Sequence, residues 1–147
     1  MANNKEKKAV ANTLPNARLT AVQVINSVFT GGAYANIALS KALGQQKYSE
    51  QDRRFVTELV YGTVKAKGTI DWLLQQLVSR PLGKIEPMIL NILRLGVFQI
   101  YFLERIPASA ACNESVNLAK KFGHDGIVKF VNGVLRGAVR SKENIVY

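Results

Sequence analysis

A nearly unbroken apolar stretch, residues 87–103, constrains the fold of this chain more than any other feature. Twelve of the sixteen residues after Pro87 are apolar, and the exceptions are Asn91, Arg94, Gly96 and Gln99. At helical spacing the three polar side chains fall in one arc, so the rest of such a helix must be covered. A membrane span needs about 20 apolar residues and does not favour a central charge. The stretch therefore predicts the central helix of an all-α domain.

Arg94 lies in the middle of this apolar stretch. Burying an unpaired cation is costly, so its guanidinium needs an anionic partner or access to water. Glu58 and Asp71 are two candidate partners, and a path to the surface is the third possibility. The sequence leaves these three possibilities open.

Six further segments carry apolar residues at three- and four-residue spacing, the pattern of amphipathic helices. They span residues 17–30, 34–43, 50–67, 69–78, 108–122 and 126–139. Asn16 and Ser49 suit N-caps, Asp52 completes a weaker variant of the capping box, and Gly68 is expected to end the third segment. No segment alternates as a strand would. Together with the central helix, the pattern predicts about seven helices.

The same spacing predicts which side chains of the flanking helices are buried. The expected core residues include Ile37, Leu39, Leu43, Ile70, Trp72, Leu73, Leu77, Leu118 and Phe122. Gly62 reduces bulk within its helix, which predicts the close approach of a neighbouring helix. Cys112 is expected to be a small core residue, and His124 a surface residue at a turn.

The charge of the chain makes polyanions the first partners to consider. Lysine and arginine number 20 against 10 aspartate and glutamate, for a net charge of +10 and a pI near 10. A basic protein that merely resists aggregation is the alternative reading. One cysteine and one histidine exclude a disulfide framework and a zinc site of usual spacing, so we expect no metal. Paired carboxylates and a glycine-rich phosphate loop are also absent, so we expect no catalytic residues.

Five basic residues are the candidates for contact with nucleic-acid phosphates. They are Arg18, Lys120, Lys121, Lys129 and Arg136. Arg18 falls in the first turn of a helix, where a cation opposes the helix dipole and so is not placed for helix stability. If the first and last helices meet, the five could form one cationic surface with Phe122 or Phe130 nearby. Phosphate contacts supply most non-specific affinity for nucleic acids.

Three motifs near the C-terminus resemble the signature of the NusB fold. They are Asn113-Glu114, the run Leu118-Ala119-Lys120-Lys121-Phe122-Gly123, and the run from Lys129 to Leu135 that reads KFVNGVL. The resemblance covers roughly residues 16–140 and implies an all-helical RNA-binding domain. Residues 1–15 are then a flexible basic tail, and residues 141–147 a frayed end or the start of a linker.

Other motifs resemble the RsmB branch (Sun/Fmu), whose members carry this fold as an N-terminal domain. They are Asp52-Arg53, Glu58–Val64, Ile70–Leu74, Arg80-Pro81-Leu82, Leu95-Gly96, Gln99-Ile100 and Arg105–Ala108. Resemblance to this branch implies that the parent protein is an S-adenosylmethionine-dependent 16S ribosomal RNA cytosine-C5 methyltransferase. Its cofactor and its cysteine nucleophile belong to another domain. We therefore expect this chain to dock ribosomal RNA without being catalytic and without binding a cofactor itself.

Two alternatives remain open at this point. The chain could be a free antitermination factor that binds leader RNA with a ribosomal protein, although only Arg18 matches that family's arginine-rich start. It could also be a protein-interaction module with weak RNA affinity, packed against a methyltransferase domain. In each case we expect a cytoplasmic protein, because the first residues lack an apolar run of signal length, and no membrane partner.

Overall fold

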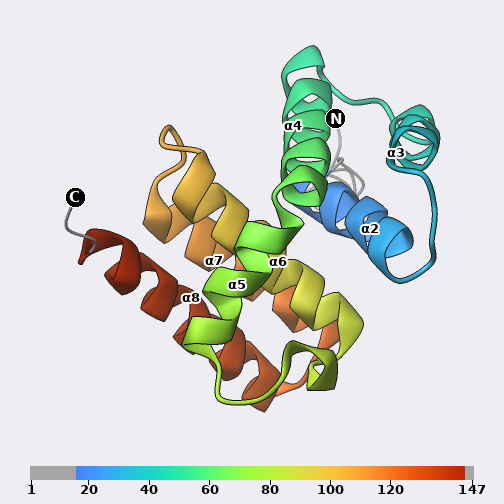
Figure 1. The fold of residues 1–147 in the computed structure, drawn as a ribbon. Coiled ribbons are helices and arrows are strands. Elements are labelled where there is room, and N and C mark those ends of the chain that lie inside the picture. Colours follow the sequence, from blue (N-terminus) through green and yellow to red (C-terminus); the bar gives the residue numbers. More distant parts are fainter. Residues whose placement is uncertain (1–15, 145–147) are drawn as a thin grey trace, which may run out of the picture.

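The structure is a computed structural model that describes residues 16–144. Seven α-helices and one 3₁₀ turn make up this part of the chain, and it contains no strand (Figure 1). The elements are α2 (Ala17–Phe29), α3 (Ala35–Gly44), α4 (Glu50–Lys65), α5 (Lys67–Leu77), η1 (Leu82–Lys84), α6 (Pro87–Phe102), α7 (Ala108–Phe122) and α8 (Asp125–Glu143). The predicted all-α fold is confirmed. The expected tail 1–15 and the residues 145–147 lie outside the described part.

Helix α6 is the centre of the domain, as the apolar stretch predicts. Every residue from Ile89 to Ile100 is buried, and α6 contacts α2, α4, α5, α7 and α8. The helix begins at Pro87, where a missing N–H costs nothing. The Glu86 carboxylate caps it by accepting hydrogen bonds from the backbone N–H groups of Met88 and Ile89.

Two groups of helices pack on either side of α6. Helices α2, α3 and α4 pack on one another as one group, and the antiparallel pair α7 and α8 forms the other. Figure 1 shows α5 crossing between the groups, where it contacts α4, α6 and α8. Helix α2 also contacts α7, so the two groups meet directly as well as through α6.

The partner of Arg94 is Asp71, one of the two predicted carboxylates. Arg94 is 8% exposed, and its Nε and Nη2 donate to the two carboxylate oxygens of Asp71 at 2.8 and 3.0 Å. Its Nη1 donates to Asn91 Oδ1 at 2.8 Å, and its guanidinium lies 5.0 Å from the ring centre of Phe29. Glu58, the other candidate, pairs with Arg105 instead.

Three predicted core side chains are exposed in the structure. Trp72 is 64% exposed, Ile37 is 61% exposed and Phe122 is 37% exposed. With 100° between successive residues, the side chain of Trp72 lies opposite the buried face of α5 that Ile70 and Leu74 define. Ile37 is likewise out of phase with Leu39, and Phe122 is the last residue of α7. For Trp72 and Ile37, the prediction of burial followed residue type at positions whose helical phase faces solvent.

The helix boundaries follow local capping with two differences from the prediction. The side chains of Asn16 and Ser49 accept hydrogen bonds from Leu19 N and Asp52 N at 3.1 and 3.0 Å, so both N-caps are confirmed. Helix α4 ends at Lys65, and Gly68 lies inside α5 rather than closing α4. Helix α8 continues to Glu143, four residues beyond its predicted end.

Candidate nucleic-acid interface

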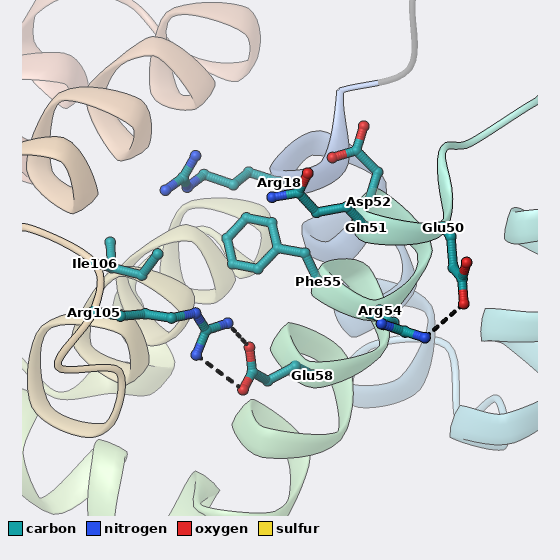
Figure 2. Close-up of a pocket in the computed structure, with 9 residues that line it drawn as sticks. All are labelled: Arg18, Glu50, Gln51, Asp52, Arg54, Phe55, Glu58, Arg105 and Ile106. Atoms are coloured by element: carbon teal, nitrogen blue, oxygen red, sulfur yellow. Dashed lines mark hydrogen bonds and ion pairs between the residues drawn. The ribbon is translucent and has the colours of Figure 1, made fainter.

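A surface pocket of about 680 Å³ lies where α2, α4 and the loop between α6 and α7 meet (Figure 2). The first turn of α2, the first half of α4 and the loop after Phe102 each supply part of its wall. Its lining consists of Arg18, Glu50, Gln51, Asp52, Arg54, Phe55, Glu58, Arg105 and Ile106. We call this site the Arg18 pocket. Arg18 is the only one of the five predicted RNA-contact residues among its lining residues.

Arg18 is held in a fixed position within this pocket. Its Nε donates a 2.7 Å hydrogen bond to Oε1 of Gln99, which is fully buried in α6 and donates from Nε2 to the Leu95 carbonyl. The Arg18 guanidinium also lies 5.1 Å from the ring centre of Phe55, a cation–π distance. Its two terminal amino groups make no hydrogen bond within residues 16–144, so they can serve a ligand.

Burial and a carboxylate of α7 shift the pKa of Arg18 in opposite directions. Desolvation lowers the pKa of its guanidinium, and the nearby carboxylate of Glu114 raises that pKa by a smaller amount. Arginine nevertheless stays protonated in proteins at neutral pH. The pocket therefore contains a positioned, partly desolvated cation.

The other two arginines of the pocket are neutralised by carboxylates. Arg105 forms a bidentate pair with Glu58, and this hydrogen-bonded carboxylate raises the pKa of Arg105. Arg54 pairs with Glu50 at 2.5 Å on the solvent face of α4. Asp52 accepts no hydrogen bond and forms no ion pair in the described part of the chain. Arg18 and Asp52 are thus the charged groups of the pocket without a direct ionic partner.

The three predicted lysines lie together at the far end of α7. Lys120 and Lys121 are exposed in the last turn of α7, and Lys129 is exposed in the second turn of α8. The antiparallel packing of the two helices places all three near the connecting turn. Between the helices, His124 caps α8, and its Nδ1 accepts from Gly126 N and Ile127 N at 3.1 and 3.4 Å.

Arg136 lies beside the second turn of α7, about two turns from these lysines. Its Nη2 donates to Asn113 Oδ1 at 3.1 Å, next to the Glu114 carboxylate that acts on Arg18. Asn113 and Lys120 are seven residues apart, about 10 Å along a helix. The structure therefore separates the five predicted residues into two groups. Arg18 and Arg136 lie near Asn113 and Glu114 in the second turn of α7, and the lysines lie around its C-terminal end.

Several residues of this surface were not predicted as contact residues. The pocket residues Gln51, Phe55 and Ile106 are among them. Arg80, in the turn after α5, places its guanidinium 4.8 Å from the ring centre of Phe130. No periodicity could reveal these contacts, because each joins helices that are distant in sequence.

The described residues show no sign of a metal centre or of a reactive nucleophile. No group of three or more His, Cys, Asp or Glu side chains within residues 16–144 could hold a metal ion. Cys112 is fully buried, as predicted, and burial raises the pKa of its thiol. No helix in this range is long and apolar enough to cross a membrane. The described surface can bind ligands by charge, stacking and hydrogen bonding.

Comparison with known proteins identifies relatives of two kinds. The probable ribosomal RNA small subunit methyltransferase B of Synechocystis sp. PCC 6803 is 42% identical over 127 residues, which are 86% of this chain and 28% of that protein. The protein of the same description from Bacillus subtilis 168 is 43% identical over 108 residues, 74% of this chain and 24% of its own. The chain thus spans about a quarter of the length of these methyltransferases.

Antitermination proteins match over nearly their whole length. The transcription antitermination protein NusB of Bacillus licheniformis is 38% identical over 120 residues, 81% of this chain and 90% of that protein. A crystal structure of the antitermination factors NusB and NusE with double-stranded RNA superposes with a TM-score of 0.79 at 25% identity. That match covers 85% of this chain and 94% of the other. The NusB structure of T. maritima shares the fold, with a TM-score of 0.77 at 21% identity, covering 86% of this chain and 92% of that chain.

The family model described as "NusB family" matches residues 15–140, which include nearly all the residues that the structure describes. The relatives of both kinds agree with this match, and the fold agrees with the solved NusB structures. This chain belongs to the NusB family.

Proposed function

We propose that this domain binds RNA and docks an S-adenosylmethionine-dependent methyltransferase on 16S ribosomal RNA, where the enzyme methylates cytosine at C5. The observation that carries the proposal is the 42% identity to a probable small-subunit ribosomal RNA methyltransferase over about a quarter of that protein's length. A domain of this size, matched within a longer enzyme, suits a docking role. The solved complex of a NusB protein with RNA supports the RNA-binding part.

The exposed cations fit the proposed interaction with RNA phosphates. Lys120, Lys121 and Lys129 are exposed side chains at one end of the α7–α8 pair, and within the described residues none of them forms an ion pair. Exposed lysines release counterions when they contact phosphates, which gives a salt-dependent affinity. Such contacts position RNA without reading its sequence.

The catalytic step of the proposed enzyme belongs to another domain. A thiolate must attack the cytosine ring to activate C5, and only an exposed cysteine of lowered pKa suits that role. Cys112 is buried and the pKa of its thiol is raised, so it does not fit. In this proposal the S-adenosylmethionine site and the nucleophile lie outside the described domain, which contributes binding and orientation.

The salt dependence of RNA affinity tests the role of the lysines. The double substitution Lys120→Glu/Lys121→Glu should weaken binding to a 16S ribosomal RNA fragment. It should also make the slope of log K against log salt shallower by roughly 1.5, since two phosphate contacts are lost. Fluorescence anisotropy between about 50 and 200 mM salt measures both quantities.

A matched control separates a local contact from the effect of net charge. Lys41→Glu/Lys47→Glu makes the same charge change at exposed positions on and after α3, away from α7. This control should weaken binding much less and should leave the slope nearly unchanged. Equal effects of the two double substitutions would remove Lys120 and Lys121 from the site.

A second candidate function is that of a free antitermination factor. It is favoured by the match to NusB of Bacillus licheniformis, because the chain covers 90% of that protein. A pull-down with NusE, the partner in the solved complex, tests this candidate. A stable complex with NusE would favour antitermination, whereas binding to the ribosomal RNA fragment without NusE would favour the docking role. No RNA binding at about 50 mM salt would leave a protein-interaction module.

A further inference from the structure

We infer that the Arg18 pocket binds one unpaired, amino-bearing nucleobase of single-stranded RNA. This inference rests on the proposed RNA binding and names the part of the RNA that the pocket would take. The pocket lies at one end of α7, and the phosphate-binding lysines are proposed at the other end. A strand that crosses α7 could therefore reach both.

The stacking surface of the pocket is already assembled. The Phe55 ring and the Arg18 guanidinium lie 5.1 Å apart, and the hydrogen bond to the buried Gln99 fixes the arginine. Aromatic rings and arginine planes are the surfaces on which proteins stack splayed bases of single-stranded RNA. Ile106 adds an apolar side chain from the α6–α7 loop (Figure 2). A planar ligand would meet little reorganisation cost, because Arg18 is held before the ligand arrives.

The charges of the pocket favour a neutral ring over a phosphate. The lining holds three arginines and three carboxylates, and two of the arginines are paired with Glu58 and Glu50. A phosphate at this site would face those carboxylates, whereas a nucleobase carries no charge. The volume of about 680 Å³ lies within the range of small-ligand pockets.

The polar edge of the pocket suits a base that carries an exocyclic amine. Figure 2 shows Gln51 and Asp52 beside Arg18, on one side of the Phe55 ring, and the Arg105–Glu58 pair on the other. The Asp52 carboxylate can accept from the N4 amine of cytosine, as carboxylates do in nucleic-acid recognition. Uracil presents an oxygen at the same position, which the carboxylate would repel. The pocket should therefore prefer cytosine to uracil.

Three RNA decamers of equal charge test the inference on the full chain: oligocytidine, oligouridine and an abasic ribose-phosphate decamer. The wild-type protein should bind oligocytidine about tenfold more tightly than the abasic decamer, given the usual strength of base–aromatic stacking. Oligouridine should bind with intermediate affinity. Phe55→Leu should bring the affinity for oligocytidine close to that for the abasic decamer, while affinity for the abasic decamer stays unchanged.

A second substitution tests base selection without touching the packed ring. Asp52→Asn should bring the affinity ratio between oligocytidine and oligouridine close to one, because the amide also donates hydrogen bonds. The loss of one negative charge should raise the affinity for all three decamers alike, so the ratio is the informative quantity. Thermal unfolding of both variants shows that the domain is folded.

The outcomes separate this inference from the proposed function. If the wild-type protein binds all three decamers equally, or if Phe55→Leu changes none or all of them by the same factor, the pocket does not bind a base. The lysine substitutions would still lower the affinity for every decamer in that case, and RNA binding would stand. If the wild-type protein binds no decamer at low salt, the proposed RNA binding itself fails.

Discussion

Arg94 shows how this domain keeps a cation in its core. Three helices contribute to its surroundings, with Asp71 from α5, Asn91 from α6 and Phe29 from α2. Asn91 in turn donates from Nδ2 to Asn26 Oδ1 at 2.9 Å, which extends the polar contacts to α2. Lys67 adds a second cation near Asp71, at 3.4 Å. The network adds polar contacts that join α5 and α2 to the buried helix α6.

Removing the charge of Asp71 should destabilise the domain strongly. Asp71→Asn leaves the Arg94 guanidinium buried without a carboxylate, and breaking buried pairs typically costs about 3 kcal/mol or more. Glu50→Gln is the matched control, since it breaks the exposed pair with Arg54 and should cost less than about 1 kcal/mol. Urea denaturation of the two variants measures both values. If both substitutions lower the unfolding free energy by similarly small amounts, the burial of Arg94 does not depend on its pair with Asp71.

The buried Cys112 thiol should react slowly and should contribute a pH dependence. Burial raises the pKa of this thiol in the folded state, whereas the unfolded chain has an ordinary thiol pKa near 8.5. Above that pH the unfolded chain releases a proton that the folded chain keeps, so stability falls as pH rises from about 8.5 toward the folded pKa. Cys112→Ala should show a smaller decrease in unfolding free energy over this range.

Thiol labelling with a disulfide reagent at pH 8 gives an independent check on Cys112. The native protein should label slowly, and labelling should become complete in urea. Rapid labelling of the folded protein would contradict the burial of Cys112.

At the scale of the helices, the crossing of α4 over α6 depends on a missing side chain. Gly62 lies against the ring of Phe98, and a Cβ at this position would overlap that ring. The predicted close approach at Gly62 is thus confirmed. Phe98 in turn stacks on Phe102, with ring centres 5.6 Å apart, so its ring has little freedom to move away.

Two glycine-to-alanine substitutions should therefore have opposite effects. Gly62→Ala should lower stability by about 1–3 kcal/mol, the usual range for overpacking a core. Gly133→Ala, on α8, should raise stability by about 0.5–1 kcal/mol, because a Cβ added there would have no atom within 4 Å and alanine favours helices. Thermal or urea unfolding measures both. A stable Gly62→Ala variant would show that α4 and α6 can separate easily.

Sequence reasoning predicted the helices well because their apolar spacing is a local property. It recognised α6 from composition alone, and it recognised the N-caps Asn16 and Ser49 from residue type. It was wrong about Trp72, since a large aromatic residue was expected to be buried although its helical phase points it to solvent. The partner of Arg94 could only be narrowed to two carboxylates and the surface, because the choice depends on how α5 crosses α6.

The candidate site was harder to predict than the fold. The basic residues could be named from charge, but the Arg18 pocket joins α2, α4 and the α6–α7 loop, which are up to 88 residues apart between Arg18 and Ile106. The sequence likewise gave no sign that Gln99 and Phe55 would hold Arg18. Tertiary contacts of this kind have no local signature.

For the molecule as a whole, the proposed RNA-binding surface has two parts that lie along α7. The Arg18 pocket lies at one end and the three lysines lie at the other, and both are supported by the buried helix α6. Trp72 on α5 and Ile37 on α3 are also exposed, and neither has a role in the proposed RNA binding. The net charge of +10 would attract RNA to any face, so location has to be measured directly.

The most direct test is to map RNA contacts by backbone amide NMR shifts while the oligocytidine decamer is titrated into the labelled protein. The proposed two-part surface predicts that shifts concentrate at Arg18, at Gln51–Phe55, at Arg105-Ile106 and at Lys120–Lys129. These shifts should saturate together at one affinity that weakens with salt. Shifts confined to the exposed faces of α3 or α5, or no shifts at low salt, would contradict it.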